Sequence, residues 1–170
     1  MPKIIENVRE QLLAVAKRQI EERGYARTTI RSVAGECGLG VGTVYNYFPS
    51  KDMLIATFMA EDWQESLSEI EAFPKEDPRA LLACIYGALQ SFSERHRALF
   101  CDSDAAKVFS SVFSERHKQL RSQLADLVLP LCARKENPAF LSQFVAEALL
   151  NWTMEGASFE EIYRVLIRLI

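Results

Sequence analysis

The sequence has little glycine or proline and no long apolar run. Only 7 glycines and 6 prolines occur in 170 residues, while 49% of the residues are hydrophobic and 25% are charged. Such a composition is typical of a folded globular chain with few linkers. The longest apolar run, residues 81–89, falls well short of the roughly 20 residues that a membrane-spanning helix needs. Glu6 stands where a secretory signal would be apolar. We therefore expect a cytoplasmic protein with no membrane partner.

Cysteine and histidine are also scarce. The four cysteines lie far apart without a C-x-x-C pair, which favours reduced, mostly buried thiols over disulfides or a zinc site. The sequence contains no H-E-x-x-H, no glycine-rich phosphate loop and no G-x-S-x-G. We therefore expect no enzyme, no metal and no cofactor. The alternative in this class is a small helical enzyme or metal protein that uses His96, His117, Cys101 and Asp102.

Charge of both signs is present, but it is unevenly distributed. The whole chain carries a net charge of −3. Residues 1–51 contain eight Lys or Arg and five Asp or Glu, a net +3, which leaves −6 for residues 52–170. A basic N-terminal part on an acidic remainder would direct one end of the molecule at a polyanion.

Apolar residues recur at steps of three and four along nearly the whole chain, which predicts helices and an all-α fold. A first helix is expected over residues 4–23, ended by Gly24. Ser50 is expected to cap the helix that carries the apolar stripe of residues 55–70. Asp77-Pro78 and Asn137-Pro138 are typical helix starts, and Ser158 with Glu161 forms a capping box. Pro130 should end or kink the helix before the Asn137-Pro138 start.

Residues 28–54 carry the most informative pattern, two short helical stretches around a tight turn. Ala34 is small where two helices cross, Gly38 supplies the turn, and Val44 is a buried anchor in the second helix. This spacing predicts a helix-turn-helix whose second helix enters the major groove of DNA. That helix should span about residues 41–47 after Gly40. It would expose a dense cluster of Gly42, Thr43, Tyr45, Asn46 and Tyr47. Hydroxyl and amide groups of this kind can meet phosphates or base edges.

The run Gly38–Leu54, together with Gly24-Tyr25 and Thr28-Thr29, resembles the signature of the tetracycline-repressor (TetR/AcrR) family over about residues 8–56. The resemblance implies a three-helix DNA-binding domain over residues 1–49, followed by a helical effector-binding and dimerisation domain over residues 50–170. It also implies DNA contacts, with phosphates held by Thr29, Thr43, Tyr45, Tyr47 and Lys51, bases nearest Arg31, Gly42 and Asn46, and Thr28 beside them. The chain departs from the family at Gly40, commonly Ser or Thr, and at Val41, often basic, which leaves Arg31 as the main base-reading cation.

We expect a homodimer that binds a palindromic operator in double-stranded DNA and is released by an unknown small molecule. The candidate ligand pocket comprises Met59, Trp63, Tyr86, Phe92, His96, Phe109 and Phe113. The candidate dimer interface comprises Leu141, Val145, Ala148, Trp152, Phe159, Ile162, Tyr163 and Leu166. For both sets the alternative is ordinary packing in the protomer core. A helical adaptor that binds only protein is the remaining alternative function, which the polar helix face and the basic N-terminal part disfavour.

Overall fold

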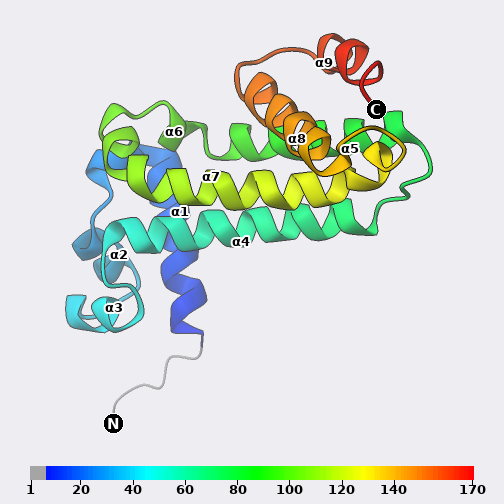
Figure 1. Cartoon of the computed structure of the whole chain (residues 1–170). Helices are drawn as coiled ribbons and strands as arrows, with labels where there is room; N and C mark the ends of the chain where they lie inside the picture. The colour runs from blue at the N-terminus through cyan, green and yellow to red at the C-terminus, as the bar shows by residue number, and fades with distance from the viewer. Residues whose placement is uncertain (1–6) are drawn as a thin grey trace. The chain divides into compact units, whose positions relative to one another are not determined.

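The computed structural model describes the backbone of residues 7–170, with side chains everywhere in that range except residues 106–116. The described chain is helical and contains no strand, which confirms the all-α prediction. Its elements are α1 (Val8–Arg27), α2 (Ile30–Glu36), α3 (Val41–Tyr47), α4 (Lys51–Ala72), α5 (Pro78–Arg95), α6 (Arg97–Phe100), α7 (Ser103–Cys132), α8 (Pro138–Met154) and α9 (Phe159–Leu166) (Figure 1). None of the described helices is long and apolar enough to cross a membrane.

The helix boundaries follow local sequence signals. Gly24 takes the left-handed φ of 80° and breaks α1, so the regular part of that helix ends where the sequence predicted. The Ser50 hydroxyl accepts a hydrogen bond from the amide of Met53 at 3.1 Å, as expected of a cap. Ser158 and Glu161 form the predicted capping box at the start of α9. Asn137 precedes α8 in a left-handed conformation without a side-chain cap, so only Pro138 behaves there as predicted.

One predicted helix is divided in the structure. The helix that starts at Asp77-Pro78 carries apolar residues at helical spacing from Leu82 to Leu99, but α5 ends at Arg95 and the short α6 begins at Arg97. Between them, His96 has φ −103° and ψ 15°, outside the helical region. His96 and Leu99 are nevertheless buried, at 3% and 2% exposure. The spacing of apolar residues therefore survives the break, because both sides of it pack inward.

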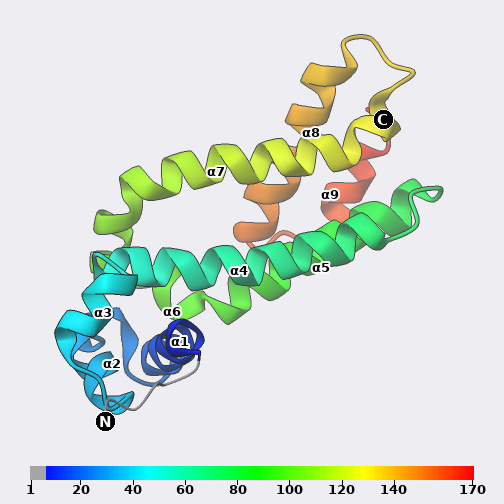
Figure 2. The same ribbon diagram turned by 90° about the horizontal axis from the view of Figure 1, so that it is seen from below.

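The chain forms two compact units. The first contains residues up to Trp63 together with His96–Ser110, and the second contains Gln64–Arg95 together with Ser111–Ile170. The first unit therefore extends further along the chain than the expected domain of residues 1–49. In it, α1 packs against α2 and α6, and α2 packs against α3; Figure 2 shows α1, α2 and α3 gathered around one another. Its fully buried side chains include Leu12, Ala16, Val33, Val44, Leu54 and Ile55.

In the second unit, α5, α8 and α9 pack against one another. The core of this unit includes Leu82, Ile85, Leu89, Val145 and Leu149, each at most 1% exposed. The hydroxyl of Tyr86 donates a hydrogen bond to the carbonyl of Ala157 at 3.1 Å, and its ring packs on Phe159. These contacts join α5 to the segment that leads into α9.

The four cysteines are unpaired thiols, in agreement with the expectation of reduced side chains. Cys132 is buried, and Cys37 and Cys84 are half-buried. Burial raises the pKa of each of these three thiols, which keeps them protonated. Cys101 is exposed, so the expectation of mostly buried cysteines fails at this position.

Candidate nucleic-acid interface

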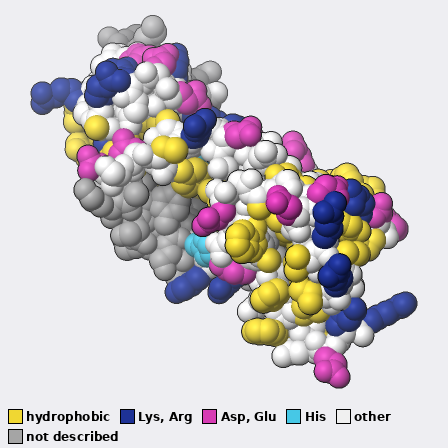
Figure 3. Space-filling view, turned by 90° about the horizontal axis from the view of Figure 1, so that it is seen from above, with side chains coloured by type: hydrophobic (Ala, Val, Ile, Leu, Met, Phe, Trp, Pro, Cys, Tyr) yellow, Lys and Arg dark blue, Asp and Glu magenta, His cyan; other side chains and the backbone are white. Residues whose placement is uncertain are grey.

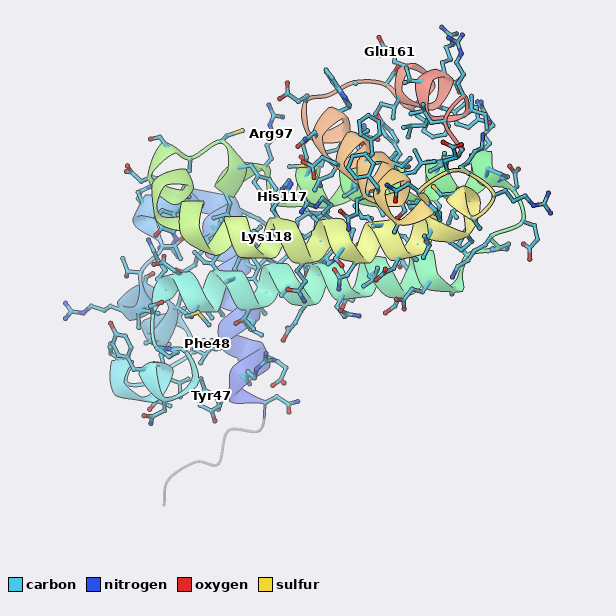
Figure 4. The ribbon with its side chains drawn as sticks, in the orientation of Figure 1. Tyr47, Phe48, Arg97, His117, Lys118 and Glu161 are labelled. Carbon is cyan, nitrogen blue, oxygen red and sulfur yellow. The ribbon has the colours of Figure 1, made fainter. Side chains whose placement is uncertain are left out.

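The helix-turn-helix is built on a small apolar core with a polar outer face. Gly38 has a left-handed φ of 67°, which provides the turn between α2 and α3. Val33, Ala34 and Val44 are at most 1% exposed, and Phe48 is 4% exposed. The core thus holds α3 by one side and leaves its other side free, as the spacing predicted. Figure 4 labels Tyr47 and Phe48 at the end of α3, of which Tyr47 is exposed and Phe48 is buried.

The outer face of α3 carries the polar side chains that the sequence singled out. Tyr45 and Tyr47 are 51% and 47% exposed, which is unusual for large aromatic residues. Gly42 and Asn46 are also exposed, and Thr43 is half-buried. Tyrosine hydroxyls and an asparagine amide on one exposed helix face can meet phosphate oxygens and base edges.

A hollow of about 440 Å³, open to solvent, lies beside this face. It is formed by the start of α2, the start of α3 and the turn into α4, and is lined by Thr28, Thr29, Ile30, Arg31, Val41, Tyr45, Pro49, Ser50 and Lys51. The hollow therefore brings five of the nine predicted DNA-binding residues into one concave surface: Thr28, Thr29, Arg31, Tyr45 and Lys51.

Thr28 and Thr29 have different roles in the structure. Thr28 is only 1% exposed, and its hydroxyl donates to the carbonyl of Gly24 at 3.0 Å. It closes the end of α1, and its contact with DNA stays a prediction. Thr29 is exposed and caps α2: its hydroxyl accepts from the amide of Ser32, and the Ser32 hydroxyl accepts in turn from the amide of Thr29. The Thr29 hydroxyl proton remains available to a phosphate oxygen.

Ion pairs correct the simple charge count of the N-terminal part. Arg9 and Lys17 pair with Glu61 and Asp62 on α4, at 2.5 Å and 2.6 Å. Arg18 and Arg23 both pair with Glu36, at the end of α2. In the part of the chain that the structure describes, Arg31 is exposed and forms no ion pair. The positive charge offered to a partner is therefore smaller than the sequence count indicates, and Arg31, which lines the hollow, is part of it.

Gln19 is a buried polar residue that the sequence reasoning missed. It is 1% exposed, and its amide donates to the carbonyl of Ser32 at 3.2 Å and to the carboxylate of Glu36 at 2.5 Å. Its carbonyl accepts from the Ser32 hydroxyl at 2.6 Å. Gln19 therefore ties α1 to both ends of α2. Its place within an apolar stripe is the only sequence signal that could have identified it.

The predicted pocket residues fall in both units. Met59, Trp63 and His96 belong to the first unit and are buried, at 7%, 8% and 3% exposure. Tyr86 and Phe92 belong to the second unit and are half-buried. Phe109 and Phe113 lie outside the described side chains. The Asp62 carboxylate lies 3.1 Å from the Nε2 of His96, and the His96 ring stacks on Phe58.

The predicted dimer residues face both inward and outward. Val145, Ile162 and Leu166 are buried in the second unit, whereas Trp152 is 58% exposed. Leu141, Ala148, Phe159 and Tyr163 are half-buried. The exposed apolar residues that the prediction left out are Phe140, Phe144, Met154, Val165 and Ile167. Figure 3, viewed from above α8 and α9, shows hydrophobic side chains gathered beside acidic and basic ones.

A buried helix-turn-helix core with an exposed polar second helix defines a nucleic-acid-binding module. Comparison with known proteins shows which family this module resembles. Residues 12–57 match the model of the bacterial regulatory proteins of the tetR family. The N-terminal part of the chain is therefore similar to the tetR family, as the sequence resemblance indicated.

Relatives and solved structures agree with this assignment. The HTH-type transcriptional repressor KstR2 of Mycolicibacterium smegmatis is 26% identical over 131 residues, which cover 71% of this chain and 62% of that protein. The chain thus spans less than two thirds of this relative. A TetR-family regulator from Pectobacterium atrosepticum superposes with a TM-score of 0.66 at 21% identity, covering 94% of this chain and 88% of that one. Thermus thermophilus FadR, solved with lauroyl-CoA, has a TM-score of 0.60 at 19% identity, covering 95% of this chain and 92% of that one. Both show the same fold.

Proposed function

We propose that the protein is a DNA-binding transcriptional regulator, a homodimeric repressor that binds a palindromic operator in the cytoplasm and is released by a small molecule. The exposed polar face of α3, on a buried core and beside the hollow, carries the proposal. In this assignment Thr29, Thr43, Tyr45 and Tyr47 lie near phosphates, and Arg31, Gly42 and Asn46 lie near bases.

Selection of binding sequences from random DNA duplexes is the primary test. We expect one palindromic sequence to be enriched, with half-sites about one helical turn apart or a small multiple of that spacing. Arg31→Ala and Asn46→Ala should each relax the preference at one base position, by about 1–3 kcal/mol. Arg134→Ala, which removes an exposed cation from the second unit, is the matched control and should change nothing. Enrichment of no sequence would refute the proposal.

The exposed apolar side chains of α8 support the dimer. Phe140, Phe144 and Trp152 are 64%, 50% and 58% exposed, and large apolar residues clustered on one helix usually mark an interface. A second copy that presents the same helix would cover them in a two-fold contact. The buried Val145, Ile162 and Leu166 belong to the protomer core and are left out of the proposed interface.

The ligand-release step is supported by the course of α4. This helix begins at Lys51, next to α3, and its next turns carry the buried Met59 and Trp63. A small apolar or aromatic molecule that displaces these side chains would move the start of α4 as well. The factor by which the ligand weakens DNA binding then equals the ratio of its affinities for the free and the DNA-bound protein. Lauroyl-CoA, the molecule bound to Thermus FadR, is a suitable first probe in native mass spectrometry and gel shifts. Equal affinity of a bound molecule for both states would exclude a switch.

A further inference from the structure

Tyr25, at the end of α1, holds the first two residues of α4. The ammonium of Lys51 lies 3.4 Å from the centre of the Tyr25 ring. The same ammonium donates a hydrogen bond to the Tyr25 carbonyl at 3.0 Å. The Tyr25 hydroxyl donates to the Asp52 carboxylate at 2.7 Å. One residue of α1 therefore makes three polar contacts with the first turn of α4, and we call these three residues the α1–α4 joint.

The joint is buried enough to be rigid. Tyr25 is 6% exposed, and Lys51 and Asp52 are half-buried. Burial raises the pKa of Tyr25, and the Asp52 carboxylate raises it further, so the hydroxyl stays protonated and keeps donating. Burial lowers the pKa of Lys51, while the charge of Asp52 opposes that change. A lysine contact with an aromatic face gains strength when it is removed from water.

Asp102, immediately before α7, also acts on the joint. Its negative charge raises the pKa of both Tyr25 and Lys51. The same carboxylate caps α7, because it accepts from the amides of Asp104 and Ala105 at 2.9 Å and 3.0 Å. Asp102 therefore both caps α7 and acts electrostatically on Tyr25 and Lys51.

These contacts change the interpretation of Lys51. A lysine that neutralises a phosphate should extend into solvent, as the family resemblance implies for this position. Here the ammonium is turned back onto Tyr25, although Lys51 also lines the hollow. Its contacts hold the start of α4 against α1, and α1 in turn holds α2 through Gln19. The direction in which α4 leaves the helix-turn-helix thus depends on Lys51.

We propose that Lys51 is a positioning residue for DNA binding, which acts through Tyr25 to fix the direction of α4 and thereby the separation of the two DNA-binding modules in the dimer. The proposal rests on the proposed DNA-binding function and concerns how the protein positions its two DNA-binding modules. It separates Lys51 from Arg31, whose exposed guanidinium is free to contact the nucleic acid directly.

The test measures affinity for the selected operator as a function of salt and of half-site spacing. Lys51→Met removes the charge, and Tyr25→Leu removes the ring while leaving Lys51 in place. Tyr25→Phe is the matched control, because it keeps the ring and loses only the hydrogen bond to Asp52. Arg134→Met controls for loss of a cation elsewhere. Each variant is first compared with the wild type by circular dichroism and thermal melting.

We expect Lys51→Met and Tyr25→Leu to lower operator affinity by about three- to thirtyfold each. The slope of log affinity against log salt should stay as in the wild type, because no phosphate contact is lost. One base pair inserted at the operator centre turns one half-site by about 34° relative to the other. The affinity lost on this insertion should be several-fold smaller in both variants than in the wild type. A substitution that merely reduced the folded fraction would lower affinity equally at every spacing.

Two results would overturn the proposal. If Lys51→Met lowers the salt slope by about one for each subunit while Tyr25→Leu does not, Lys51 is a phosphate contact. If Lys51→Met keeps the wild-type spacing penalty, the joint is structural only. Should Tyr25→Leu fail to fold, Lys51→Met decides both points alone. If the wild type itself selects no sequence, the proposed function fails together with this inference, whereas either result above removes only the inference.

Discussion

Asp62 should contribute much more to stability than its neighbour Glu61, although both carboxylates pair with a base on α1. Asp62 accepts from Lys17 at 2.6 Å and lies 3.1 Å from His96. The side chains of Asp62 and His96 are 14% and 2% exposed. The Arg9–Glu61 pair is exposed at 43% and 46%. The two positions therefore form a natural comparison of buried and exposed ion pairs on one helix.

The expected magnitudes follow from burial. Removing one partner of a buried pair costs about 3–5 kcal/mol, because the other partner is left without compensation. The side chain of Lys17 is 31% exposed and can turn to water, so we reduce the expected cost of Asp62→Ala to about 2–3 kcal/mol. Breaking an exposed pair costs about 0.2–1 kcal/mol, which is the expectation for Glu61→Ala. The variants should thus differ by about 2 kcal/mol, roughly thirtyfold in the folding equilibrium.

Trp63 offers a local probe for this measurement. It is 8% exposed, follows Asp62 directly and belongs to the same compact unit. The chain has only one other tryptophan, Trp152. In a Trp152→Phe background, guanidinium unfolding followed by fluorescence therefore reports on the first unit alone. Equal losses for Asp62→Ala and Glu61→Ala, or a larger loss for Glu61→Ala, would show that burial does not determine the strength of these pairs.

Three further predictions concern the second unit and the α1–α2 contact. Phe144→Asp should give a monomer in sedimentation velocity, whereas Met53→Asp, which also charges an exposed apolar residue, should remain dimeric. Burial raises the pKa of Glu147, but hydrogen bonds from His117 and Asn151 and the charge of Arg121 lower it by more, to below the ordinary 4.5. The stability that ionised Glu147 contributes is then fully present above pH 4.5 and is lost as the pH falls through the pKa of Glu147 in the folded protein. Glu147→Gln should therefore lower the free energy of unfolding at pH 7, and the difference from the wild type should disappear in acid unfolding curves. Gln19→Leu should lower the free energy of unfolding by about 1–3 kcal/mol in denaturant titrations, and the exposed Gln90→Leu by far less.

Local signals were sufficient to predict most of the helix-turn-helix. Gly38 takes the left-handed turn conformation, α3 spans Val41–Tyr47, and Tyr45 and Tyr47 are exposed, all as the sequence predicted. Each of these features depends on residues only a few positions apart. The burial of Thr28 was not predicted, because it depends on the hydrogen bond to Gly24 and on the packing around the end of α1.

Features that depend on distant residues could not be read in the same way. The α8 stripe chosen from the sequence contains Val145, which is buried in the protomer, while Phe144, one position away, is 50% exposed. Apolar residues occur on more than one side of α8, so periodicity alone could not tell which side faces α5. The contact between Tyr25 and Lys51 spans 26 residues and links an aromatic ring to a cation, a pairing that no periodic pattern indicates.

The contacts between α1 and the first turns of α4 together determine how a displacement of α4 would act. The joint at Tyr25 fixes the start of α4, and Lys17 fixes it three turns later through Asp62. Tyr25 lies beyond the break in α1 at Gly24, so these contacts hold α4 from both sides of that break and leave it little freedom to move without α1. A ligand that displaced α4 would therefore carry α1, and with it α2 and α3, as one body. Each recognition helix would keep its own contacts with DNA, and the switch would act by changing the separation of the two modules in the dimer.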